Sequence, residues 1–165
     1  MSFKIVVTGG TIDKQYNPIT GNLDLKQSQI KDLLSQANCY DDIETINVIL
    51  KDSLEINLKE RQLIAKYCLR ESCEQLIITH GTDTMAETAC LLNKKITNKT
   101  IVITGAMIPF TIKNSDSLFN LGMAIASVQI LAHGVYIVIG GKIFNANNVT
   151  KNTLTGQFET LNGKY

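Results

Sequence analysis

The sequence predicts an α/β fold, a doubly wound and mainly parallel sheet with helices on both faces. Short runs rich in Val and Ile alternate along the chain with segments that have the hydrophobic period of a helix. The runs are apolar at nearly every position, which is typical of strands buried on both faces. The 165 residues contain no stretch that resembles a linker or a repeat. We therefore expect one domain, residues 1–165.

Five strands and four helices are expected, in alternation. The strands are predicted at residues 4–8, 43–50, 75–79, 100–104 and 135–139. The helices are predicted between them, at residues 28–37, 58–70, 85–93 and 117–132. Two helix starts have the pattern of a capping box, Asn57 with Glu60 and Thr84 with Glu87. After residue 139, Gly140-Gly141 predicts a hairpin or loop at the far edge of the sheet.

The composition excludes several classes of protein. The formal charge of +1 comes from 16 Lys and Arg against 15 Asp and Glu, and the lysines form no basic stripe. Neither nucleic acid nor an anionic membrane is therefore expected as a partner. The N-terminus lacks the pattern of a signal peptide, and no apolar run approaches the roughly 20 residues that span a bilayer. The four cysteines have no zinc-site spacing, so we expect reduced thiols in a cytoplasmic protein.

Four segments that follow predicted strands are rich in Gly, Thr, Ser and Asp. In a doubly wound fold the ligand lies outside the carboxyl ends of the strands, where such segments meet. We call this edge the rim, and it comprises residues 8–12, 51–54, 80–84 and 105–109. The rim is therefore where the sequence is expected to carry its chemistry.

The Gly9-Gly10 pair in the first rim segment lets the backbone turn sharply and approach a ligand closely. A phosphate-binding turn is an alternative, but the third glycine of G-x-G-x-x-G is missing and no G-K-[ST] follows. An ordinary tight turn is the other alternative. The glycine pair alone does not decide among them.

The segment from His80 to Thr84 closes a strand and opens a helix, so its N–H groups point where an anion would lie. Thr84 is expected to cap the helix, which leaves the Thr82 hydroxyl and the Asp83 carboxylate at the rim, although Asp83 has a second capping role as its alternative. His80 is expected to bond a neighbouring loop rather than act as a base. Lys151 is an ordinary solvated lysine unless it folds back to Thr82, where it could take a hydroxyl proton.

Five segments, in this order, resemble the bacterial-type L-asparaginases. They are Thr8-Gly9-Gly10-Thr11-Ile12, Asp52-Ser53, Thr79-His80-Gly81-Thr82-Asp83-Thr84-Met85, Gly105-Ala106-Met107 and Val149-Thr150-Lys151. The first and third correspond to the two signatures of that family. The resemblance covers nearly the whole chain and implies hydrolysis of L-asparagine to L-aspartate and ammonia, without a metal ion or other cofactor.

The resemblance also implies a role for each matching residue. Thr11 would be the nucleophile that forms an acyl-enzyme, and Tyr16 would hydrogen-bond it. Thr82, Asp83 and Lys151 would activate the attacking water or relay protons. The substrate would be held by Ser53 at its α-carboxylate and by Asp83 at its α-ammonium, with backbone N–H groups near Gly10 and Thr82 stabilising the oxyanion.

Three departures from the family pattern affect these expectations. Family chains are commonly about twice as long, so the usual C-terminal domain is expected to be absent. Leu54 stands where many members have a polar residue, and Ile108 replaces an arginine. We accordingly expect a homo-oligomer, a dimer or a tetramer, that uses the apolar helix at 117–132, and a strong preference for asparagine over glutamine. The alternatives are an amino-acid-binding module with little turnover and, more distantly, a nucleotide-binding domain.

Overall fold

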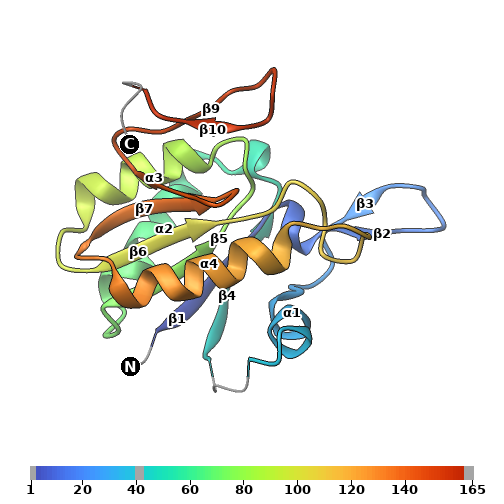
Figure 1. The fold of residues 1–165 in the computed structure, drawn as a ribbon, viewed down its shortest axis with the longest axis horizontal. Helices are drawn as coiled ribbons and strands as arrows, with labels where there is room; N and C mark the ends of the chain where they lie inside the picture. The colour runs from blue at the N-terminus through green and yellow to red at the C-terminus, as the bar shows by residue number, and fades with distance from the viewer. Residues whose placement is uncertain (1–2, 40–42, 162–165) are drawn as a thin grey trace.

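The computed structural model describes residues 3–39 and 43–161. A six-stranded sheet with the order β4-β1-β5-β6-β7-β8 runs through the molecule (Figure 1). All neighbouring strands pair in parallel except β7 and β8. The strands are β1 Lys4–Gly9, β4 Thr45–Lys51, β5 Gln75–Thr79, β6 Thr100–Thr104, β7 Gly134–Ile139 and β8 Lys142–Asn145. The predicted fold class is confirmed.

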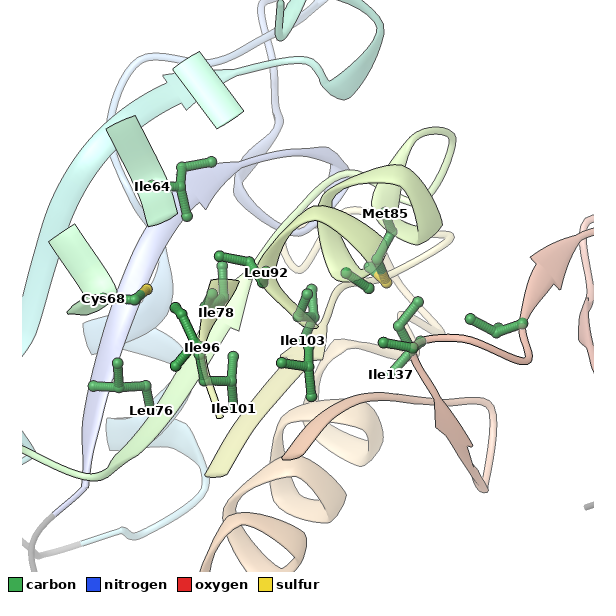
Figure 2. Packing of buried hydrophobic residues seen from close by; sticks show 14 of the residues in the cluster. Ile64, Cys68, Leu76, Ile78, Met85, Leu92, Ile96, Ile101, Ile103 and Ile137 are labelled. Atoms are coloured by element: carbon green, nitrogen blue, oxygen red, sulfur yellow. The ribbon is translucent and has the colours of Figure 1, made fainter. Parts of the chain in front are cut away.

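Two helices cover each face of the sheet. The helices are α1 Ile30–Gln36, α2 Leu58–Arg70, α3 Met85–Lys95 and α4 Ser117–Ile130. Helices α2 and α3 share one apolar cluster with the sheet, and α1 and α4 share the other. Figure 2 shows Cys68 and Leu92 pointing toward the strand residues Ile78 and Ile101 in the first cluster. Burial of strand residues on both faces explains why the strand runs are almost continuously apolar.

Most predicted elements match the structure, and the differences occur at the ends. Strands β5 and β6 and helix α2 have the predicted bounds. Helix α1 begins at Ile30 rather than residue 28, because the Asp13 carboxylate accepts hydrogen bonds from Ser28 Oγ and Gln29 N and holds both outside the helix. Helix α4 ends at Ile130, since Leu131 turns into an extended conformation before β7.

One of the two predicted capping boxes is present. Asn57 and Glu60 bond each other's backbone N–H groups at the start of α2, as predicted. The prediction for Thr84 was wrong, because its side chain makes no capping bond to α3. The Thr84 hydroxyl instead donates to the carbonyl of Ser53, 2.8 Å away.

Helix α4 makes a crossover of unusual hand. Helices α3 and α4 both carry the chain one strand further in the same direction, from β5 to β6 and from β6 to β7. They nevertheless cover opposite faces of the sheet, so the two crossovers have opposite hands. Crossovers between parallel strands are almost always right-handed. The segment between β6 and α4 therefore crosses the rim, where Phe110 N donates to Ile12 O.

Two small hairpins complete the described chain. Strands β2 (Gln15–Tyr16) and β3 (Leu23–Asp24) pair in one, and β9 (Thr150–Lys151) and β10 (Phe158–Glu159) pair in the other. Figure 1 shows both hairpins projecting from the sheet layer, β2–β3 on one side and β9–β10 on another. Gly140 and Gly141 form the turn between β7 and β8, which confirms the hairpin predicted after residue 139.

Candidate active site

The topology places the ends of β1 and β5 at a switch point of the sheet. From β1 the chain moves outward to β4, whereas from β5 it moves the other way to β6. Ligands of such sheets bind at the carboxyl ends of the two strands where the direction changes. The segments that follow β1 and β5 carry Thr11 and Thr82 respectively. The fold therefore brings the segments that carry the two candidate threonines to one edge of the sheet.

These two segments touch backbone to backbone. A Cβ on Gly10 would overlap the backbone of Gly81, and Gly10 has a φ of 88°, which favours glycine. Thr11 and Thr82 each follow one of the two glycines in contact. The close approach explains the glycine at position 10 without a phosphate ligand. It holds the first and third rim segments together at the switch point.

Ser53 lies directly against the same contact. An ideal Cβ on Gly81 would lie 2.6 Å from Ser53 Oγ. The Ser53 side chain is only 1% exposed, and its Oγ has no hydrogen-bond partner among the residues that the structure describes. A buried hydroxyl without a partner is uncommon in folded proteins, so a polar group of a ligand would satisfy it.

Lys151 folds back onto the rim. Its Nζ lies 2.7 Å from Thr82 Oγ1 and 2.6 Å from Asp83 Oδ1. Thr82 is buried and the Lys151 side chain is only 12% exposed, whereas Asp83 remains largely open to solvent. The lysine thus joins a hydroxyl and a carboxylate in one charged cluster at the surface of the rim.

The β9–β10 hairpin is anchored in a way that accounts for the position of Lys151. Phe158 pairs with Lys151 across the hairpin, is buried, and packs against Phe144 with ring centroids 6.4 Å apart. Val149 is buried in the same apolar cluster as α3. Burial of these apolar side chains secures the hairpin to the core and so directs Lys151 toward Thr82.

His80 has a structural position below the rim. Its ring is fully buried, with Nδ1 2.8 Å from Gly81 O and Nε2 2.9 Å from Thr88 Oγ1. Burial lowers the pKa of His80 to about 4, so the ring is neutral at pH 7. The His80 ring thus connects the turn at Gly81 to helix α3, which matches the expectation that His80 bonds a neighbouring loop.

Two candidate groups lie differently from the expectation. Tyr16 is 61% exposed on the β2–β3 hairpin, and its hydroxyl makes no hydrogen bond to Thr11. The N–H group of Gly10 donates to the carbonyl of Lys51, so it is already engaged. Within residues 3–39 and 43–161, the N–H groups of Gly81 and Thr82 make no hydrogen bond. The N–H group of Thr11 likewise has no hydrogen-bond partner in the described part of the chain, so all three groups are donors available to an oxyanion near the threonine pair.

Several contacts within the rim were not predicted. Lys14 Nζ lies 2.5 Å from Asp52 Oδ2 and joins the first rim segment to the second. The Asp52 carboxylate also accepts from Leu54 N, which fixes the short 3-10 helix η2 (Ser53–Glu55). No local pattern in the sequence marks an ion pair between residues 38 positions apart. The first two rim segments are thus joined by an ion pair between Lys14, which belongs to none of the motifs, and Asp52, which does.

Comparisons with known proteins match nearly the whole chain to one family. The family model described as "Asparaginase, N-terminal" matches residues 2–163. The glutaminase-asparaginase of Acinetobacter glutaminasificans is 33% identical over 160 residues, which are 89% of this chain and 48% of that protein. The chain thus spans about half the length of the curated relatives it matches.

Two solved structures have the same fold. The thermostable L-asparaginase from Thermococcus kodakarensis superposes with a TM-score of 0.85 at 29% identity, over 98% of this chain and 52% of that one. A probable cytoplasmic L-asparaginase from Campylobacter jejuni gives a TM-score of 0.82 at 32% identity, over 96% and 52%. With the family model spanning residues 2–163, these matches identify the chain as a member of the asparaginase family, corresponding to its N-terminal domain.

Proposed function

We propose that the chain hydrolyses L-asparagine to L-aspartate and ammonia. The observation that carries the proposal is the cluster of Lys151, Thr82 and Asp83, which lies beside the contact between Gly10 and Gly81, the neighbours of Thr11 and Thr82 in the sequence. A lysine amine on a buried threonine hydroxyl is an arrangement that moves protons during acyl transfer. Membership of the asparaginase family, and the names of the relatives, support the amide of asparagine as the substrate.

In the first half of the reaction Thr11 acts as the nucleophile. Its hydroxyl oxygen adds to the side-chain amide carbon of asparagine, and the N–H groups of Gly81 and Thr82 stabilise the negative charge that develops on the amide oxygen. The carbon–nitrogen bond then breaks. Ammonia leaves with the proton that Thr11 has lost, and an aspartyl ester remains on Thr11.

In the second half a water molecule replaces Thr11. Lys151, as the free amine, takes the hydroxyl proton of Thr82 while Thr82 takes a proton from the water, whose oxygen adds to the ester carbon. The ester carbon–oxygen bond breaks, aspartate leaves, and the proton returns to the Thr11 oxygen. Tyr16 would hydrogen-bond Thr11 during this cycle, which requires the β2–β3 hairpin to move toward the rim.

The charged ends of the substrate have acceptors and donors on the same rim. The unpartnered Ser53 hydroxyl donates to the α-carboxylate. Asp83 binds Lys151 through Oδ1 and offers Oδ2 to the α-ammonium group. Because these groups are on neighbouring segments joined at Gly81, they hold the substrate at a defined distance from the threonine pair.

Helix α4 presents an apolar surface that suits a second copy of the chain. Phe119 and Ile130 are 58% and 79% exposed on the outer side, and the small residues Gly122 and Ala126 lie between them. These positions recur at helical spacing and carry no charge, so two such faces can approach closely. We propose a homo-oligomer through this face.

We also propose a cytoplasmic location, which is how the Campylobacter jejuni relative is described. No helix of residues 3–39 and 43–161 has the length and hydrophobicity needed to cross a membrane.

The proposal is tested by removing each hydroxyl and measuring ammonia release. Thr11→Ala and Thr82→Ala are each expected to lose on the order of 10³-fold in kcat, because the two residues act as a unit. Both variants should keep the wild-type fold and the rise in melting temperature that L-aspartate produces. A wild type that binds aspartate but releases no ammonia would instead be an amino-acid-binding module. A variant that keeps more than about a tenth of the wild-type rate removes its threonine from the mechanism.

A further inference from the structure

Thr84 uses its hydroxyl for a contact between segments rather than for its own helix. It lies at the N-cap of α3, where a threonine ordinarily accepts a bond from the helix backbone. Here Oγ1 donates to the carbonyl of Ser53, 31 residues away, at 2.8 Å. This bond connects the segment that carries the proposed carboxylate-binding residue to the segment that carries Thr82 and Asp83.

Arg61 makes a second link between the same two segments. It is buried on α2, and its Nη1 donates to the carbonyl of Ile56, which directly follows η2. Its Nη2 lies 2.9 Å from Glu87 Oε2 in the first turn of α3. A guanidinium group holds two acceptors in a fixed planar geometry. Arg61 therefore sets the spacing between the Ser53 segment and the start of α3.

We infer that Thr84 and Arg61 are positioning residues that fix the distance from Ser53 to Thr82 and thereby select the length of the substrate. The inference rests on the proposed function, in which Ser53 holds the α-carboxylate and the amide lies at the threonine pair. Ser53 Oγ also packs against Gly81, so the two segments are in direct contact between these links. Neither Thr84 nor Arg61 needs to touch the substrate for this effect.

A fixed distance discriminates between amides that differ by one methylene. An asparagine held at Ser53 presents its carboxamide at the threonine pair, whereas the carboxamide of glutamine overshoots by about one carbon–carbon bond. A displacement of about 1 Å costs on the order of 10²-fold in rate. If the two links are loosened, asparagine is held less well and glutamine is less strongly rejected, so affinity and discrimination fall together.

The test compares Thr84→Val with Thr84→Ser, using ammonia release from asparagine and from glutamine. Valine keeps the shape and removes the hydroxyl, and we expect a KM for asparagine about 10-fold higher with a smaller change in kcat. We also expect the ratio of kcat/KM for asparagine to that for glutamine to fall about 10-fold. Thr84→Ser keeps the hydroxyl and should therefore have the wild-type KM for asparagine and the wild-type ratio of kcat/KM for the two amides. Arg61→Lys, which keeps the charge and loses the fork, shifts both in the direction of Thr84→Val.

The control is Thr97→Val, an exposed threonine beyond the far end of α3, which should behave as wild type. A Thr84→Val protein with a lower melting temperature but an unchanged KM and an unchanged substrate ratio overturns the inference, because the hydroxyl is then merely structural. If Thr84→Val does not fold, Arg61→Lys decides by the same two values. A wild type that neither releases ammonia nor binds aspartate overturns the proposed function, and this inference falls with it.

Discussion

Lys151 and Thr82 are 69 residues apart in the sequence, and a single contact of 2.7 Å between Nζ and Oγ1 joins them. Lys151→Met keeps most of the stem and removes the amine, so it separates charge from packing. We expect kcat to fall on the order of 10³-fold, with little change in melting temperature. Lys151→Arg should fail as well, since a guanidinium cannot give up its proton near neutral pH. Steady-state kinetics and thermal unfolding of both variants check this, and a near-normal rate would make Lys151 an ordinary surface lysine.

His80 makes stability depend on pH in a defined window. Burial lowers its pKa from 6.5 to about 4, so the unfolded chain takes up the proton before the folded protein does. The contribution is fully present above pH 6.5 and is lost as the pH falls from 6.5 toward 4, by on the order of 3 kcal/mol. Urea unfolding at several pH values should show this slope, and His80→Gln should flatten it. An identical slope in wild type and His80→Gln would contradict the assignment.

At the scale of elements, the sequence predicts what depends on local periodicity and misses what depends on distant partners. Strands buried on both faces and the Asn57–Glu60 box were predicted because their signals lie within a few residues. Thr84 was assigned as a cap because its true acceptor, Ser53 O, is far away in sequence. The hand of the α4 crossover has no local signal either, since it depends on which face the helix covers.

The contact between the first and third rim segments predicts a specific effect of Gly10→Ala. The new methyl group would overlap the backbone of Gly81 and push the two threonine-bearing segments apart. We expect kcat/KM to fall on the order of 10²-fold or more. Gly140→Ala is the matched control, because Gly140 also has a positive φ but has open space where the methyl group would lie. Equal losses of activity in the two variants would show that backbone strain, rather than the contact, is responsible.

At the scale of the whole molecule, the sequence predicts the layers of the fold and the edge of the sheet at which the candidate site residues lie. The motif residues Thr11, Ser53, Thr82 and Asp83 all follow strand ends, so the fold class alone sends them to one rim. The position of Lys151 depends on a hairpin held by Phe158 and Phe144, which periodicity does not reveal. The ion pairs that Lys14 makes with Asp52 and Arg61 makes with Glu87 likewise have no local signal in the sequence.

We expect two copies of the chain to associate through the exposed face of α4, and charged residues introduced on this face should disrupt the association. Phe119→Lys together with Ile130→Lys places two cations on the face where a second copy would lie, and desolvating them opposes association. Light scattering should give a species larger than 18.2 kDa for the wild type and 18.2 kDa for the double variant. Leu69→Lys, on an exposed position of α2, should leave the wild-type size unchanged. A wild type of 18.2 kDa at working concentration would rule out this interface.

Ammonia release from asparagine and from glutamine, measured side by side with the purified protein, tests the central claim most directly. One methylene in a pocket is worth about 10–200-fold in discrimination, and in the proposed arrangement, with the α-carboxylate at Ser53, the shorter amide is favoured. We predict that the protein hydrolyses asparagine and that this activity depends on Thr11. The kcat/KM for glutamine should be at least about 10-fold lower than that for asparagine. Ammonia release from neither amide, or equal release by wild type and Thr11→Ala, would contradict the assignment of this rim as an asparaginase site.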